Sequence, residues 1–242
     1  MTNITLIGTV HIDHKGHERL AKALDHHRPD IICLEETPLG ATKGWKTHLE
    51  MMEKLKNTPW HRIYSQEQIE RVKIELLSSF YEQWVPKNYK NIKSDTKLYC
   101  IDDNVEILNP LMGSTQSDWL MQQLRAGKTI KQLITPADIS IADFVKNGSV
   151  EEHQAYVDSI YDGNHEAELI QKYGREIFDL IVVKRDQLFA SKIRTVHEKN
   201  PDKKIVTIVG AGHLFSGYGS NTYDLLADLN PMRVKLKEFD GM

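Results

Sequence analysis

Two histidines in this chain of 242 residues each stand three positions after a glycine, at the end of an apolar run. The first motif is GTVH, from Gly8 to His11, and the second is GAGH, from Gly210 to His213. Imidazole acts as a metal ligand or as a general acid or base near neutral pH. Glycine lets the backbone turn sharply or come close to a ligand. We therefore predict one site that joins both histidines, with Gly8, Gly210 and Gly212 shaping its backbone.

Carboxylates follow two further apolar runs. Glu35 and Glu36 come after IICL at 31–34, and Asp102 ends the run that starts at 97. An acid at the end of a buried strand is costly unless it is paired or bound to a metal. Strand alternation places Glu35 and Glu36 on opposite faces. We favour Glu35 as the functional carboxylate and keep Glu36 and Asp102 as further candidates.

A charged pair, Arg185 and Asp186, falls on the apolar stripe of a predicted helix rather than opposite it. The stripe contains Val182, Phe189 and Ile193, at helical spacing. Charges on an apolar face require partners. The pattern is equally compatible with a structural ion pair and with a contribution to the site.

The elements that must position these residues form an α/β pattern. Continuous apolar runs predict strands at 4–8, 30–35, 97–102 and 204–209, and alternation predicts another at 232–239. A helix predicted at 16–27 lies between the first two strands, which gives a βαβ unit and a mostly parallel sheet. The carboxyl ends of parallel strands share one edge, where ligands bind. We therefore expect the two histidines, Glu35 and Asp102 at that edge.

The rest of the chain reads as helical. Because strands occur at both ends, we predict a single α/β domain over 1–242, whose central sheet is built from both ends of the chain, with helical insertions or a cap at about 37–95 and 105–175. Two independent domains are less favoured. Helices are predicted at 48–56, 65–84, 116–125, 136–146, 150–161 and 166–199, the second of them capped by Ser65.

Composition excludes several classes of protein. There are 31 basic and 34 acidic residues, so the chain has no basic footprint for nucleic acid. No run approaches the roughly 20 apolar residues of a membrane span, and the start lacks the features of a signal peptide. Cys33 and Cys100 are expected to be buried, reduced thiols. The expected location is the cytoplasm, and the oligomeric state stays open, a homodimer being one option.

Two other motifs give weaker evidence of a functional site. The GAG at 210–212 is not a dinucleotide fingerprint, because G-x-G-x-x-G requires glycine at 215, where Phe215 stands. Histidines near the first motif tempt one to see a local metal cluster, but scattered histidines on helix surfaces are the commoner case. We expect that surface setting for His14, His17, His26, His27, His48, His61, His153, His165 and His197.

Together these motifs resemble the TraB/PrgY family, whose wider group includes the Tiki-type proteases and is related to the ChaN and erythromycin-esterase-like proteins. The matching pieces are GTVH at 8–11, PDIICLE at 29–35, KRD at 184–186 and VGAGHLFSG at 209–217. They stand in the family's order. An arginine that often follows the glutamate in the family is absent here, and Asp102-Asp103 replaces its Asp-Arg.

The resemblance implies a metal-dependent hydrolase of peptidase type. His11, His213 and Glu35 would hold a divalent metal, with zinc, manganese and cobalt equally suited to such ligands. Glu35 would be either ligand or general base, and Arg185 and Asp186 would be the family's arginine-aspartate pair. Arg185 would stabilise the oxyanion. The partner would be a peptide or a small-molecule substrate.

Three alternatives remain open from the sequence. A binding protein could sequester a peptide or small ligand in the same crevice, as pheromone sequestration by relatives implies. A metal-free, esterase-like hydrolase could use the same residues. A structural or assembly protein would tolerate replacement of both histidines.

Overall fold

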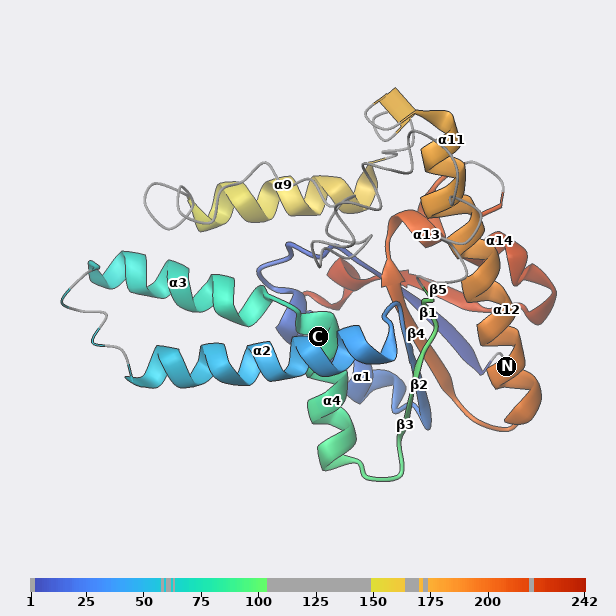
Figure 1. Cartoon of the computed structure of the whole chain (residues 1–242), viewed down its shortest axis with the longest axis horizontal. Coiled ribbons are helices and arrows are strands. Elements are labelled where there is room, and N and C mark those ends of the chain that lie inside the picture. The colour runs from blue at the N-terminus through green and yellow to red at the C-terminus, as the bar shows by residue number, and fades with distance from the viewer. Residues whose placement is uncertain are drawn as a thin grey trace.

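The computed structural model describes residues 3–57, 59, 62, 64–103, 149–163, 170–171, 174–217 and 220–242. Its centre is a five-stranded parallel sheet of order β3-β2-β4-β1-β5, as Figure 1 shows. The fold is α/β, as predicted. The strands come from both ends of the chain: β1 (Ile4–Thr9), β2 (Ile31–Leu34), β3 (Lys97–Cys100), β4 (Ile205–Gly210) and β5 (Met232–Lys235).

Strand order decides which strand ends become neighbours. β4 lies between β1 and β2, with Thr9 opposite Gly210 and Leu34 opposite Ile208. The two Gly-x-x-His motifs therefore follow adjacent strands, although almost the whole chain separates them. Because all pairs are parallel, the carboxyl ends share one edge, along which the segments that carry Asp102, Glu35, His213 and His11 follow in that order.

Apolar side chains of alternating strand positions form a core on each face of the sheet. On one face, Ile7, Ile32 and Val206 pack beneath α1 (Gly16–His27) and α4 (Tyr81–Ile92). On the other, Ile4, Ile31 and further strand residues pack beneath α12 (Lys184–Lys199). Both faces are therefore covered, which accounts for the continuous apolar strands in the sequence.

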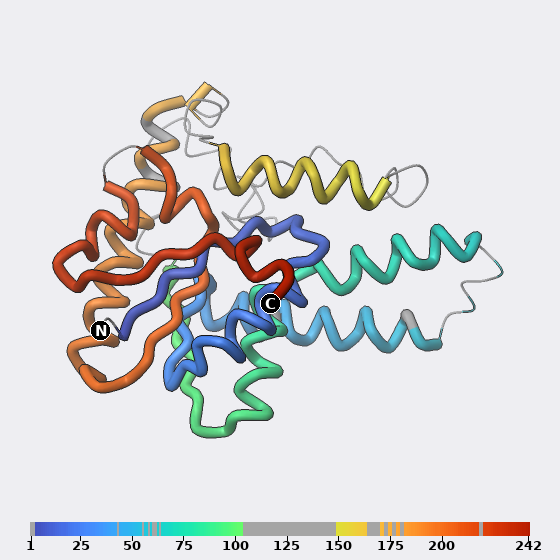
Figure 2. The backbone as a smooth tube through the Cα atoms, turned by 180° about the vertical axis from the view of Figure 1, so that it is seen from behind, coloured from blue at the N-terminus to red at the C-terminus, as the bar shows by residue number. Residues whose placement is uncertain are grey.

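A helical arm projects from this core. It consists of α2 (Pro38–Asn57) and α3 (Gln66–Ser78), which run side by side in Figures 1 and 2. α9 (Val150–Asp162) lies along the same side of the molecule, above the arm in Figure 1. The helix predicted at 48–56 is thus the second half of a longer one. Ser65 caps α3 in a capping box with Gln68, as predicted.

Two helices predicted as continuous are interrupted. The one expected at 65–84 breaks at Ser79 and Phe80, where Phe80 adopts the left-handed conformation with φ of 57° and α4 begins in a new direction. Within the one expected at 166–199, α11 (Arg175–Phe178) passes through a π-helical turn, η3 (Asp179–Val183), into α12. Such turns shift the phase of a helix and are frequent at functional sites. This one directly precedes Arg185 and Asp186.

The last part of the chain also departs from its pattern. The strand predicted over 232–239 ends at Lys235, because Leu236 and Phe239 turn into the core from a 3₁₀ turn, η5 (Leu236–Phe239). Three short elements precede it: α13 (Gly212–Phe215), α14 (Thr222–Leu225) and η4 (Ala227–Leu229). The helices predicted at 116–125 and 136–146, with most of the insertion at 105–175, lie outside the described residues. In the part that is described, no helix is long and apolar enough to cross a membrane.

Candidate functional site

The structure brings three of the predicted residues together around Gly210, the last residue of β4. A β-carbon placed on Gly210 would lie 3.4 Å from Oε2 of Glu35 and 3.8 Å from Cε1 of His11. It would also lie 3.7 Å from Cδ2 of His213. The amide of Gly210 donates to Oε2 of Glu35 at 2.6 Å. Both histidines and the glutamate therefore meet at one point of the sheet edge.

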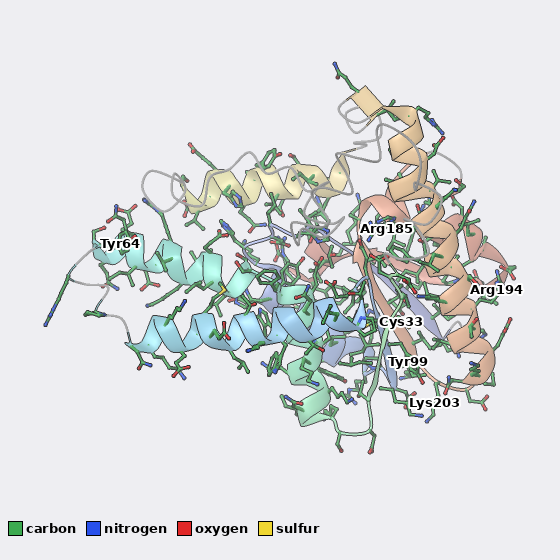
Figure 3. All side chains as sticks on the ribbon, in the orientation of Figure 1. Cys33, Tyr64, Tyr99, Arg185, Arg194 and Lys203 are labelled. Carbon is green, nitrogen blue, oxygen red and sulfur yellow. The ribbon has the colours of Figure 1, made fainter. Side chains whose placement is uncertain are left out.

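Glu35 is held by a completely buried arginine. Nη2 of Arg185 donates to Oε1 of Glu35 and to Oδ2 of Asp102, both at 2.7 Å. The cation thus joins the ends of β2 and β3 to α12, and in Figure 3 Arg185 lies beyond Cys33 toward the upper end of the sheet. Burial disfavours the charged guanidinium, but Asp102 and Glu35 outweigh it and raise the pKa of Arg185. Asp102 therefore belongs to the site through Arg185.

The guanidinium of Arg185 has donors to spare. Its Nε and Nη1 atoms have no hydrogen-bond partner among the described residues, although the side chain is 0% exposed. Unpaired buried donors are costly and uncommon in folded proteins. Within the described part of the chain, Arg185 is thus only partly satisfied by its two carboxylate partners.

His213 is held by the other member of the charged pair. Its Nδ1 atom lies 3.0 Å from Oδ1 of Asp186, and its Nε2 atom lies 3.6 Å from Oε1 of Glu35. The amide and hydroxyl of Thr222 also donate to Asp186. Burial lowers the pKa of the imidazole, but Asp186 and Glu35 outweigh it and raise the pKa of His213 to about 9. At neutral pH the site without a bound cation therefore contains an imidazolium between two carboxylates.

His11 has a carboxylate partner that the sequence analysis did not find. Nδ1 of His11 lies 2.8 Å from both carboxylate oxygens of Glu82, in the first turn of α4. Glu82 also accepts from the hydroxyl of Thr9, the last residue of β1. The sequence could have indicated Glu82 only through the helix break at Phe80, because Glu82 belongs to no motif. Thr222 belongs to no motif either, so the sequence did not indicate it.

The glycines act differently from the prediction. None of Gly8, Gly210 and Gly212 has a positive φ, so their backbone conformation does not require glycine. Gly8 lies within β1, where a β-carbon would stand 2.9 Å from the ring of Phe215. A β-carbon on Gly210 would make only ordinary van der Waals contacts with Glu35, His213 and His11. A β-carbon on Gly212 would meet nothing within 4 Å, so the structure gives no reason for a glycine there.

Glu36 lies apart from this group. Its carboxylate accepts from the side-chain amide of Gln83, next to Gly40 at the start of α2. The two adjacent glutamates thus point to different partners, as strand alternation predicts. Both are buried, at 5% exposure for Glu35 and 8% for Glu36.

The prediction of helix-surface histidines was wrong for three residues. His14, His48 and His153 are buried. His14 stacks on His153 with ring centroids 3.8 Å apart, and His48 stacks on Trp84 at 4.4 Å. Of the remaining surface candidates, His61 and His165 lie outside the described residues.

The residue types at this site are ones that bind divalent cations in proteins. A metal-bound imidazole usually donates its other N–H to a carboxylate, and both histidines have Nδ1 beside one, which leaves Nε2 of each for a ligand. Two such nitrogens and the Glu35 carboxylate match catalytic sites of zinc, manganese or cobalt. Among the described residues, no three acidic, histidine or cysteine side chains already stand close enough to hold an ion. The residue types therefore fit a cation, but their side chains are not arranged around one point that could hold it.

Comparisons of the chain with protein-family models, with curated proteins and with solved structures found no match.

Proposed function

We propose that the protein is a hydrolase of peptidase type, with its centre at the edge of the sheet around Gly210. The observation that carries the proposal is that His11, His213 and Glu35 lie together there. Their side chains are held by Glu82, Asp186 and Arg185, respectively. His11, His213 and Glu35 would hold a divalent cation. That cation would supply a Lewis acid that polarises a substrate carbonyl.

The chain's own groups would do the rest. Oε1 of Glu35 lies 3.6 Å from Nε2 of His213, so both groups face the same space. If Glu35 serves as general base rather than as ligand, its carboxylate would accept the proton of the attacking water. Arg185 orients Glu35, and Asp186 orients the ring of His213 with Nε2 toward the shared space. Nε and Nη1 of Arg185, which have no hydrogen-bond partner among the described residues, would supply positive charge for an anionic reaction centre.

A metal-free hydrolase of the esterase-like kind is the second candidate. The observation in its favour is that Glu35 is already paired with Arg185, while no described group of three ligands is close enough for an ion. In that case His213 and Asp186 would work as a general acid–base pair, as an imidazole backed by an aspartate does in other hydrolases. Both candidates use the same residues and differ in their response to chelation.

Assays of the whole chain on peptides and esters separate these functions. We expect turnover after reloading with zinc, manganese or cobalt, and its loss after dialysis against a chelator. Glu35→Gln should lower kcat by about 10² to 10⁴, the contribution of a positioned acid or base. Elemental analysis should show less metal in His11→Ala and His213→Ala than in the wild type.

Glu36→Gln is the matched control, because it changes the neighbouring buried glutamate, which bonds to Gln83 and not to Arg185. It should keep turnover. Turnover that withstands chelation would select the metal-free hydrolase. Tight binding of a peptide without turnover, unchanged by Glu35→Gln, would replace the hydrolase with a sequestering protein.

A further inference from the structure

Glu82 is the partner of His11 and lies 71 positions away from it in the chain. Its two oxygens stand at equal distance from Nδ1 of the imidazole, and the side chain is buried. It comes from α4 on one face of the sheet, whereas Asp186 reaches His213 from α12 on the other. Each Gly-x-x-His histidine thus has a carboxylate of its own on Nδ1.

The start of α4 is built to hold this position. Phe80 directly before the helix is in the left-handed conformation, which a bulky residue rarely adopts. Tyr81 follows, and its hydroxyl donates to the carbonyl of Val10, next to His11. Its ring fills the space beside Gly16, where a β-carbon would stand 2.4 Å away. Two consecutive residues of one helical turn therefore bind two consecutive residues after β1.

The contact has a chemical consequence for the ring. A neutral imidazole carries one proton, and a carboxylate can only accept when it is ionised. Glu82 therefore favours the tautomer with the proton on Nδ1, which leaves the lone pair on Nε2. An acid in the first turn of a helix is also stabilised by the helix dipole. The hydroxyl of Thr9 donates to the same carboxylate and steadies it.

We propose that Glu82 is the positioning residue of His11: it sets the Nδ1–H tautomer and directs Nε2 to the site around Gly210. Glu82 is not a catalytic residue, since His11 lies between it and the reacting atoms. The inference rests on the proposed function only in taking Nε2 of His11 as the working nitrogen. The tautomer itself is a property of the protein without metal or substrate.

The first experiment is long-range ¹H–¹⁵N NMR of the whole, metal-free chain at a pH where His11 is neutral. We expect the Nδ1–H form of His11 in the wild type and its loss in Glu82→Ala. Glu82→Gln keeps a carbonyl oxygen that can accept the same proton, and it should retain much of the Nδ1–H form. A merely structural glutamate would change the fold of the helix without selecting a tautomer.

The second experiment measures how much the orientation of His11 contributes to metal affinity and to kcat/KM. Calorimetric titration with manganese(II) alone should show affinity about 10- to 100-fold weaker in Glu82→Ala, as loss of such a partner typically gives, with a similar loss in kcat/KM. Glu75→Ala is the control, because Glu75 lies 3.5 Å from Nε2 of His14, which the proposed centre does not use. It should leave both values unchanged.

The outcomes separate the two proposals. A changed tautomer in Glu82→Ala, with no metal binding by any form, supports Glu82 and rejects the metal centre. An unchanged Nδ1–H tautomer in Glu82→Ala overturns the inference, whatever the activity. Should Glu82→Ala fail to fold, the wild type, Thr9→Val and Glu82→Gln decide, because all three keep an acceptor for the Nδ1 proton and should show the Nδ1–H form. An Nε2–H form of His11 in the wild type overturns the inference.

Discussion

Among the residues that the structure describes, two arginines are almost completely buried, and each binds at least two carboxylates, but they use their donors differently. Arg19 in α1 donates from Nε and from both terminal nitrogens, to Asp13, Asp158 and Asp240. Arg185 in α12 donates from Nη2 alone, and its other donors have no partner among the described residues. With the described residues as partners, the guanidinium of Arg19 is saturated and that of Arg185 is not.

The difference supports the proposal that the Arg185 cluster belongs to a functional site, whereas the Arg19 cluster is structural. The Arg19 cluster ties α1 to the loop after β1, to α9 and to the C-terminal residues, and Asp158 and Asp240 stay partly in contact with solvent. The partners of Arg185 are 3% and 8% exposed in their side chains, so water satisfies little there. A buried polar network with unmet donors is costly unless something binds to it. The unsaturated cluster is the one at the carboxyl edge of the sheet.

Removing Arg185 should have the largest effect. Arg185→Gln leaves Glu35 and Asp102 buried without a cation, which should lower the free energy of unfolding by about 3 to 5 kcal/mol. It should also lower kcat about 10² to 10³, as loss of one donor for an anionic centre does. Chemical denaturation and assays of the folded fraction measure the two effects. Full activity in the folded fraction would indicate that the Arg185 cluster is structural, like the Arg19 cluster.

Removing Arg19 should affect stability alone. Arg19→Gln should lower the free energy of unfolding by about 3 kcal/mol, because Asp13 stays buried without its cation. Activity per folded molecule should not change. Asp240→Asn is a graded control, since that carboxylate is 47% exposed and should cost under about 1 kcal/mol. A drop in kcat for folded Arg19→Gln would contradict the division between the clusters.

A smaller effect is expected at Thr222, which supports Asp186. Thr222→Val removes the hydroxyl that donates to Oδ1 of Asp186 and keeps the shape of the side chain. One lost bond to a buried charge should cost about 1.5 kcal/mol, or roughly tenfold in kcat/KM. Thr195→Val is the control, because its hydroxyl bonds only to a backbone carbonyl on the exposed side of α12. Equal losses in both variants would argue against a role for Asp186.

The pH dependence of stability tests α9, which Arg19 contacts through Asp158. His153 in α9 is buried against His14, and burial, with the charge of His14, lowers the pKa of His153 to about 4, against the pull of Glu75 and Asp13. The unfolded chain takes up this proton near 6.5, so stability should fall as the pH drops from 6.5 toward 4. Denaturation of His153→Gln should show a shallower fall over that window. An unchanged slope would mean that His153 is not the group responsible.

Local pattern predicted much of the fold. The strands β1, β2, β3 and β4, the helix α1 and the cap at Ser65 were all read from hydrophobic period and capping chemistry, because each depends on neighbours in the sequence. The same reasoning placed His11, Glu35, Asp102 and His213 at one edge, because a parallel sheet orders its strand ends. The family resemblance and the hydrolytic reaction stay predictions.

Only the tertiary structure decided which residues meet. The strand order that puts β4 between β1 and β2, and the break at Phe80 that aims Glu82 at His11, depend on contacts between distant segments. The pairing of Arg185 with Asp102, across 83 positions, leaves no local signature either. A strand or a cap follows from the free energy of a few adjacent residues. A carboxylate beside an imidazole depends on how whole helices pack on the sheet. The sequence motifs therefore indicated the two histidines, whereas only the tertiary structure determined which carboxylates lie beside them.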